Sequence, residues 1–251
     1  MERAWREHFR GYLFADSAGG RLFGRWSDDP DDRPTLAHEA AVRKIVGTDG
    51  PLRAPAVLES SATWLLEEAV DSEPCRGPDR VDAVASAAEQ IAQLDLPPAP
   101  RRDRAVSMRT RMRLVRSSLP LRDFRASRRT LADPGLRHVT SHGDFHRGNV
   151  LVRDGVAWVV DWELSGKRPA GYDVMQFWAT LDDAEDREYL FELAVSSIGA
   201  DRRRELLRLR HALVVRTIVG KLAAPMAFDR DPAGARDLLA LLPVLRTEAG
   251  L

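Results

Sequence analysis

Hydrophobic and polar residues alternate in two short runs near the N-terminus. The runs GYLFAD and RLFGRW are separated by SAGG, and this pattern predicts two antiparallel strands joined by a glycine turn. A longer segment, LAHEAAVRKIVG, has Leu36, Glu39, Val42 and Val46 at spacings of three and four. It predicts a helix that begins near Pro34 and ends at Gly47. The runs AVLES and TWLLEEAV then predict a further pair of strands.

The pattern becomes mainly helical after a polar segment, DSEPCRGPD, which reads as a linker. An amphipathic helix is predicted over RVDAVASAAEQIAQLDL, an arginine-rich helix over about residues 102–119, and helices in most of the chain after Asp186. We therefore predict an N-terminal lobe at 1–68, a hinge at 69–78 and a C-terminal lobe at 79–251.

One β segment interrupts the helical part: TSHGDFHRGNVLVRDGVAWVVDWE, residues 140–163. Asp154-Gly155 is a strong two-residue hairpin signal, which pairs Arg153 with Val156. That register brings Asn149 and Asp161 to the same end of the hairpin. An amide oxygen and a carboxylate are hard ligands suited to Mg²⁺, and Asp144 precedes Asn149 by five residues.

An aspartate, an asparagine five residues later and an aspartate after the next hairpin is the order of groups in kinases. HGDFHRGN followed by VVDWE resembles the signature of the aminoglycoside phosphotransferase and choline kinase-like family. The resemblance continues into GYDVMQFW and covers most of residues 12–180. It implies an α+β, two-lobed protein-kinase-like fold, with a reduced β-rich N-terminal lobe and a larger, mainly helical C-terminal lobe.

The resemblance also implies a role for each matching position. Asp144 would be the catalytic base or the group that orients the acceptor hydroxyl, and Asn149 and Asp161 would hold Mg²⁺. The remaining matched positions would contact the nucleotide or support the loops. They are Arg25 and Glu39 for the phosphates, backbone groups from Glu67 to Ala69 for adenine, His142, His146 and Glu163 around the catalytic loop, and Asp173 as a structural aspartate.

The implied activity is an ATP- and Mg²⁺-dependent transfer of a γ-phosphoryl group to a hydroxyl of a small molecule, such as an amino sugar or an amino alcohol. Two features depart from the family pattern. Arg25 stands where lysine is usual, and MERAWREHFRG contains no glycine-rich phosphate loop, so the first strand is predicted to be shortened or absent. The alternative is therefore a nucleotide-binding protein with this fold that has lost turnover.

Composition narrows the class of protein further. Lys+Arg and Asp+Glu are both 38, which argues against a dedicated nucleic-acid or membrane-surface binder. Cys75 is the only cysteine, so an intrachain disulfide is excluded. We expect a cytoplasmic enzyme whose partner is a small-molecule hydroxyl acceptor, with no nucleic acid and no membrane.

Other interpretations of the same residues stay open at this point. The hairpin could be an ordinary β-turn-β unit with polar ends, although that does not account for the ordered set of polar residues around it. His142 and His146 could instead bind the metal of a hydrolase. The arginine-rich run could bind an acidic partner, although a solvated helix face is the simpler interpretation.

Overall fold

The structure is a computed structural model that describes residues 3–5, 10–15, 21–26, 33–48, 50, 52–61, 63–70, 77–97, 119–223 and 231–251. The chain forms two compact units. The first comprises Met1–Arg101 and Thr140–Arg168, and the second comprises Arg102–Val139 and Pro169–Leu251. The predicted arginine-rich helix, Cys75 and the Gly19-Gly20 turn lie outside the described residues. None of the described helices is long and apolar enough to cross a membrane.

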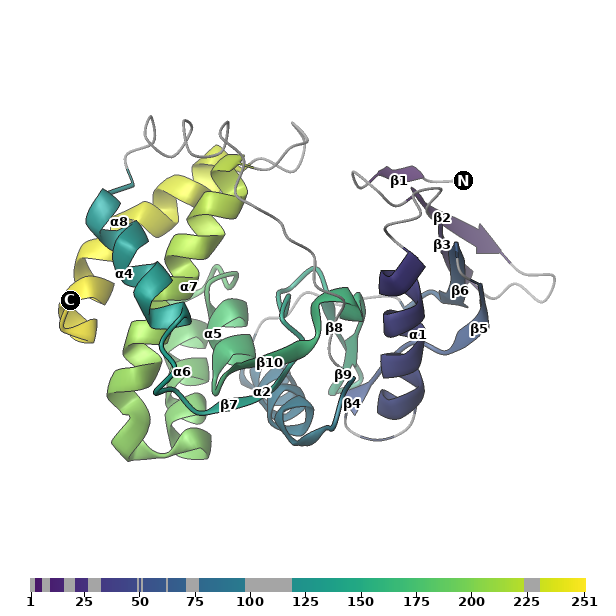
Figure 1. Cartoon of the computed structure of the whole chain (residues 1–251), viewed down its shortest axis with the longest axis horizontal. Coiled ribbons are helices and arrows are strands. Elements are labelled where there is room, and N and C mark those ends of the chain that lie inside the picture. The colour runs from purple at the N-terminus through teal and green to yellow at the C-terminus, as the bar shows by residue number, and fades with distance from the viewer. Residues whose placement is uncertain are drawn as a thin grey trace. The chain divides into compact units, whose positions relative to one another are not determined.

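A five-stranded sheet forms one half of the first unit (Figure 1). Its strands, in spatial order, are β1 (Arg3–Trp5), β2 (Arg10–Ala15), β3 (Arg21–Trp26), β6 (Trp64–Glu68) and β5 (Val57–Ser60). All neighbouring strands are antiparallel. The first strand, expected to be shortened or absent, is present with three residues. Residues 6–9, which join it to β2, are outside the described part of the chain.

Helix α1 (Arg33–Val46) lies against this sheet and carries the predicted apolar face. Leu36 and Ala40 of α1 are buried against Leu65 of β6, with Val57 packed beside them. Gly47 has a φ of 75°, and its N–H donates to the Arg43 carbonyl, so the helix ends where glycine was predicted to end it.

The other half of the first unit contains a helix and a small sheet. Helix α2 (Pro78–Gln93) presents a row of buried alanines and valines, and the sheet contains β4 (Leu52–Arg53), β9 (Val156–Val159) and β8 (Val150–Arg153). A 3-10 helix, η2 (Trp162–Leu164), follows β9 and packs on α1. Strands β7 (His138–Ser141) and β10 (Gly166–Pro169) pair with each other in a separate two-stranded sheet.

The second unit is helical and is organised around α7 (Arg203–Ala223). This helix contacts α4 (Leu121–Leu131), α5 (Tyr172–Trp178) and α8 (Pro232–Ala249), as Figure 1 shows, while α6 (Ala184–Ile198) packs on α5. A helix with partners on several sides must be apolar on most of its surface. Its buried residues include Leu206, Leu209, Leu213, Val214, Val215 and Ile218.

A buried polar cluster joins three helices of this unit. Asp123 of α4 accepts hydrogen bonds from His211 Nε2 at 3.0 Å and from Arg246 of α8 at 3.2 Å. Burial lowers the pKa of His211, and the hydrogen bond and negative charge of Asp123 offset this only in part. The folded state therefore favours the neutral imidazole.

This cluster predicts a pH dependence of stability. Because the pKa of His211 is lower in the folded chain than in the unfolded chain, its contribution is fully present above about pH 6.5 and is lost as the pH falls through the folded value. We expect the free energy of unfolding to decrease from pH 7 to pH 5, by up to about 1.4 kcal/mol per pH unit. Urea unfolding of the wild type and of His211→Gln measures this, and equal pH slopes in the two proteins would contradict it.

Candidate active site

The hairpin β8–β9 has the predicted register. Arg153 pairs with Val156 and Val150 with Val159, and the Val160 N–H donates to the Asn149 carbonyl at 2.9 Å. Asp154 and Gly155 have φ angles of 51° and 70°, as a type I′ turn requires. The turn therefore determines which side chains meet at the far end of the hairpin, and it brings Asn149 and Asp161 to that end.

The loop between β7 and β8 contains the predicted catalytic residues. Asn149 Nδ2 donates to the Asp144 carbonyl at 3.0 Å and to Asp144 Oδ2 at 3.3 Å. The negative charge of Asp161 also acts on Asp144, which is consistent with the three side chains lying in one site.

The side-chain oxygen of Asn149 is a suitable ligand for a divalent cation. Asn149 is 1% exposed, and its Oδ1 has no hydrogen-bond partner among the residues that the structure describes. A buried acceptor without a partner is unfavourable, and coordination to a cation would satisfy it. The backbone of Asp161 is left-handed, with φ of 64° and ψ of 58°, a conformation that a non-glycine residue adopts at a cost and that is frequent at functional sites.

His142 of the catalytic-loop motif is hydrogen-bonded at both ring nitrogens. Its Nδ1 accepts the Asp144 N–H at 3.3 Å, so Nε2 carries the proton and donates to the Val160 carbonyl at 2.9 Å. The ring is fully buried and stands edge-on to Trp162, with 4.8 Å between ring centroids. Both ring nitrogens are therefore engaged in structural hydrogen bonds, which argues against the alternative of a hydrolase metal ligand.

His146 lies beside the carboxylate of Asp144. Its Nδ1 accepts the Gly148 N–H at 3.0 Å, which leaves Nε2 directed to Asp144 Oδ2 at 3.5 Å. Burial raises the pKa of Asp144, but the hydrogen bond and charge of His146 outweigh burial, so the net effect is a lowered pKa. Asp144 is consequently ionised at neutral pH and can accept a hydrogen bond from a hydroxyl group.

Arg25 connects the sheet to the hairpin. Its guanidinium donates to Asp161 Oδ1 at 3.1 Å and to Glu39 Oε2. Burial on its own would lower the pKa of Arg25, but the charges of Glu39 and Asp161 raise it overall. The arginine therefore provides a permanent positive charge beside the proposed Mg²⁺ ligand.

Two further residues belong to this network, and the sequence interpretation missed how they act. Arg43, one turn after Glu39 on α1, donates to Glu39 Oε1 at 2.6 Å and to Glu67 Oε2. The buried side chain of Glu67 pairs with Arg43. The expected contact of the Glu67 backbone with adenine stays a prediction. The spacing of Glu39 and Arg43 by four helical residues was the available signal.

A second contact joins α1 to the segment after Asp161. His38 Nε2 lies 2.8 Å from Ser165 Oγ, and both side chains are buried. Burial lowers the pKa of His38, so its neutral form is favoured. Nothing in the spacing of residues 38 and 165 indicates this contact, because only the fold brings them together.

The other predicted site residues occupy separate places. The Ala69 N–H donates to the Arg21 carbonyl at 2.9 Å, so this amide is already hydrogen-bonded. Glu163 lies in η2, and Asp173 is buried in the first turn of α5, which belongs to the second unit. Their roles stay predictions.

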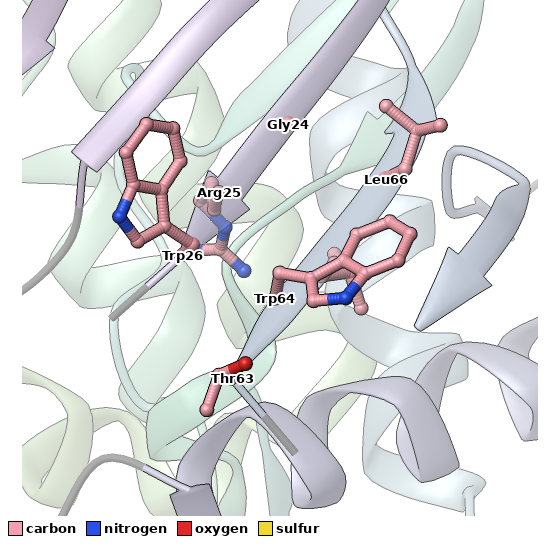
Figure 2. A pocket seen from close by; sticks show the side chains of 7 residues that line it. Gly24, Arg25, Trp26, Thr63, Trp64 and Leu66 are labelled. Atoms are coloured by element: carbon pink, nitrogen blue, oxygen red, sulfur yellow. The ribbon is translucent and has the colours of Figure 1, made fainter. Parts of the chain in front are cut away.

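A hollow of about 360 Å³ opens on the sheet beside Arg25, and Figure 2 shows the residues that line it. Trp26 faces Trp64 and Gly24 faces Leu66 across β3 and β6, so these four residues share one face of the sheet. Arg25 and its partner Leu65 share the opposite face, where α1 packs. The hollow therefore opens on the face opposite α1, and Arg25 is the member of the ion-pair network that lines it.

Comparison with known proteins shows which family the chain belongs to. A sequence profile of the Phosphotransferase enzyme family matches residues 2–207. The chain therefore belongs to this family of phosphotransferases. No curated protein gives a significant match.

Solved structures share the fold at low sequence identity. Macrolide 2′-phosphotransferase MphH from Brachybacterium faecium is 16% identical, with a TM-score of 0.61 over 96% of this chain and 91% of that one. A choline/ethanolamine kinase family protein from Mesorhizobium loti is 17% identical, with a TM-score of 0.61 over 98% and 87%.

A thermostable mutant of aminoglycoside phosphotransferase APH(4)-Ia, in complex with AMP-PNP and hygromycin B, is 15% identical, with a TM-score of 0.63 over 98% of this chain and 93% of that one. The predicted α+β, protein-kinase-like fold is thus confirmed. The predicted lobe boundaries stay a prediction.

Gly143 tests how closely the catalytic loop is packed. Its φ is 82°, and a Cβ there would lie 2.3 Å from the Leu164 carbonyl oxygen, whereas Gly155 has a φ of 70° and open space around it. Gly155→Ala should cost about 1–2 kcal/mol of stability through backbone strain alone. Gly143→Ala should cost at least about 1 kcal/mol more, because backbone must also move. Chemical denaturation of both variants measures the difference, and equal losses would show that the loop has room.

Proposed function

We propose that the protein transfers the γ-phosphoryl group of ATP to a hydroxyl group of a small molecule, with Mg²⁺ at Asn149 and Asp161. One observation carries the proposal. Arg25 is ion-paired to both Glu39 and Asp161, while the neighbouring loop directs Asn149 against Asp144 and leaves the buried Asn149 Oδ1 without a partner among the described residues.

The residues divide the work of phosphoryl transfer, which depends mainly on positioning and on neutralising charge. Asp144 orients the acceptor hydroxyl and receives its proton as the new oxygen–phosphorus bond forms and the bond to the β-phosphate oxygen breaks. ADP and a phosphate monoester are the products. Bound Mg²⁺ would neutralise phosphate charge, and Arg25 would contact the phosphates from the side of the sheet.

The fold does not specify the acceptor, because enzymes with the same fold act on different substrates. The similar structures are named for macrolides, for choline and ethanolamine, and for hygromycin B, so compounds of these kinds are the first to test. We place the reaction in the cytoplasm, where ATP is available. The alternative, a relative that binds nucleotide without turnover, has less support, because the family match is accompanied by the full set of Asp144, Asn149 and Asp161.

Removing the charge of Asp161 should abolish the gain in affinity that Mg²⁺ gives. We expect Asp161→Asn to weaken binding of AMP-PNP by at least about tenfold in the presence of Mg²⁺, and much less without it. Asparagine tolerates the left-handed backbone, so the substitution tests charge without adding strain. Titration calorimetry measures the effect, and Asp154→Asn, at the exposed turn of the same hairpin, is the matched control. An equal effect of the two substitutions would contradict the assignment.

Asp144 should affect turnover and leave binding unchanged. We expect Asp144→Asn to lower kcat by about 100-fold or more with an accepted hydroxyl compound, while the affinity for Mg²⁺ and AMP-PNP changes by less than about threefold. ADP release measured under saturating ATP provides kcat. A variant with unchanged kcat would show that this carboxylate is not the group that orients the hydroxyl.

A further inference from the structure

Arg43 is a buried cation to which neither the family motif nor the proposed chemistry gives a role. It is 4% exposed and lies on the inner face of α1. Its two terminal nitrogens donate to different carboxylates: one to Glu39 Oε1 at 2.6 Å and the other to Glu67 of β6. The guanidinium therefore bridges its own helix to a strand of the sheet.

Glu39 is held from two sides as a result. Arg25 occupies Oε2 and Arg43 occupies Oε1, so each oxygen of this buried carboxylate has a guanidinium partner. With one partner only, the carboxylate group could rotate about its terminal bond, and Arg25 could follow it. With two partners, its plane and its distance from the sheet are both fixed.

We propose that Arg43, tethered by Glu67, is a positioning residue that fixes Glu39 and, through Glu39, the phosphate-binding guanidinium of Arg25. This inference rests on the proposed function, because it assumes that Arg25 contacts the phosphates. It also gives the Glu67 side chain a role in phosphate binding, because Glu67 anchors Arg43. Arg43 itself does not touch the nucleotide or the reacting atoms.

The pKa values of Glu39 and Glu67 are consistent with a role of Arg43 in holding both carboxylates. Burial raises the pKa of Glu39, but the charges of Arg25 and Arg43 outweigh burial and lower it overall. Burial also raises the pKa of Glu67, and there the charges of Arg43 and Arg25 offset burial only in part. Glu67 is thus the carboxylate that can become protonated when Arg43 is lost, which limits the damage to the fold.

The test compares two neighbouring cations of α1. Arg43→Met removes the bridge, and Lys44→Met removes a positive charge from the exposed face of the same helix. The probe is AMP-PNP with Mg²⁺, titrated into the full chain by calorimetry below the unfolding temperature of each variant. We expect Arg43→Met to weaken binding by about tenfold or more, because small displacements of a binding group are costly. Lys44→Met should change it by less than about twofold.

A thermodynamic cycle separates positioning from a merely structural role. If Arg43 acts through Arg25, Arg43→Met should have almost no further effect on AMP-PNP affinity in an Arg25→Met background. Arg43→Lys, which keeps the charge but cannot bridge two carboxylates in the same way, should recover only part of the affinity. Equal effects of Arg43→Met in both backgrounds would overturn the proposal.

A second pair of substitutions keeps the test valid if Arg43→Met does not fold. The double variant Arg43→Met/Glu67→Met replaces the ion pair by apolar side chains and leaves no unpaired charge at residue 67. It should still bind the probe about tenfold more weakly than the wild type, because Glu39 Oε1 has lost its partner. Binding as tight as that of the wild type would overturn the proposal.

The same titrations distinguish a failure of the proposed function from a failure of the proposed role of Arg43. If the wild type does not bind AMP-PNP with Mg²⁺ at millimolar concentration, the proposed function is wrong, and the role of Arg43 is wrong with it. If the wild type binds and Arg43→Met binds equally well, only the role of Arg43 is wrong.

Discussion

Buried ion pairs between two arginines and three carboxylates hold the first unit together. Arg25, Arg43, Glu39, Glu67 and Asp161 come from β3, α1, β6 and the residue after the β8–β9 hairpin. Removing each ion from water costs several kcal/mol, so the fold must keep them paired. The pairs therefore fix the positions of the sheet, the helix and the hairpin relative to one another, and the proposed nucleotide site depends on these positions.

The catalytic loop depends on a different constraint, which is close packing of backbone. Gly143 lies against the Leu164 carbonyl, where any side chain would collide, and the two ring nitrogens of His142 connect the loop to the end of β9. These contacts hold Asp144 and Asn149 without using their carboxylate and amide oxygens. Asp144 Oδ2 contacts Asn149 Nδ2 and His146, and Asn149 Oδ1 has no hydrogen-bond partner among the described residues.

Local patterns predicted two features of the fold, and the resemblance to the phosphotransferase family implied the fold class, while the roles of the site residues stay predictions. The Asp154-Gly155 turn predicted the register of the hairpin, and the period of α1 placed Glu39 on its buried face. The roles of Arg43 and Glu67 were missed, because a buried arginine and a surface arginine look the same in a chain so rich in this residue. The His38–Ser165 contact was missed for a related reason, since 127 residues separate its members.

The sequence by itself determined the period of α1, the turn of the β8–β9 hairpin and the order of Asp144, Asn149 and Asp161, because these features depend on residues close together along the chain. Only the tertiary structure decided which charges are buried together and which oxygen of Glu39 meets which arginine. Burial and pairing depend on strands and helices that are distant in sequence. When those elements pack, they exclude water from the charged groups. The lost hydration destabilises each buried ion, and the ion pairs offset that loss.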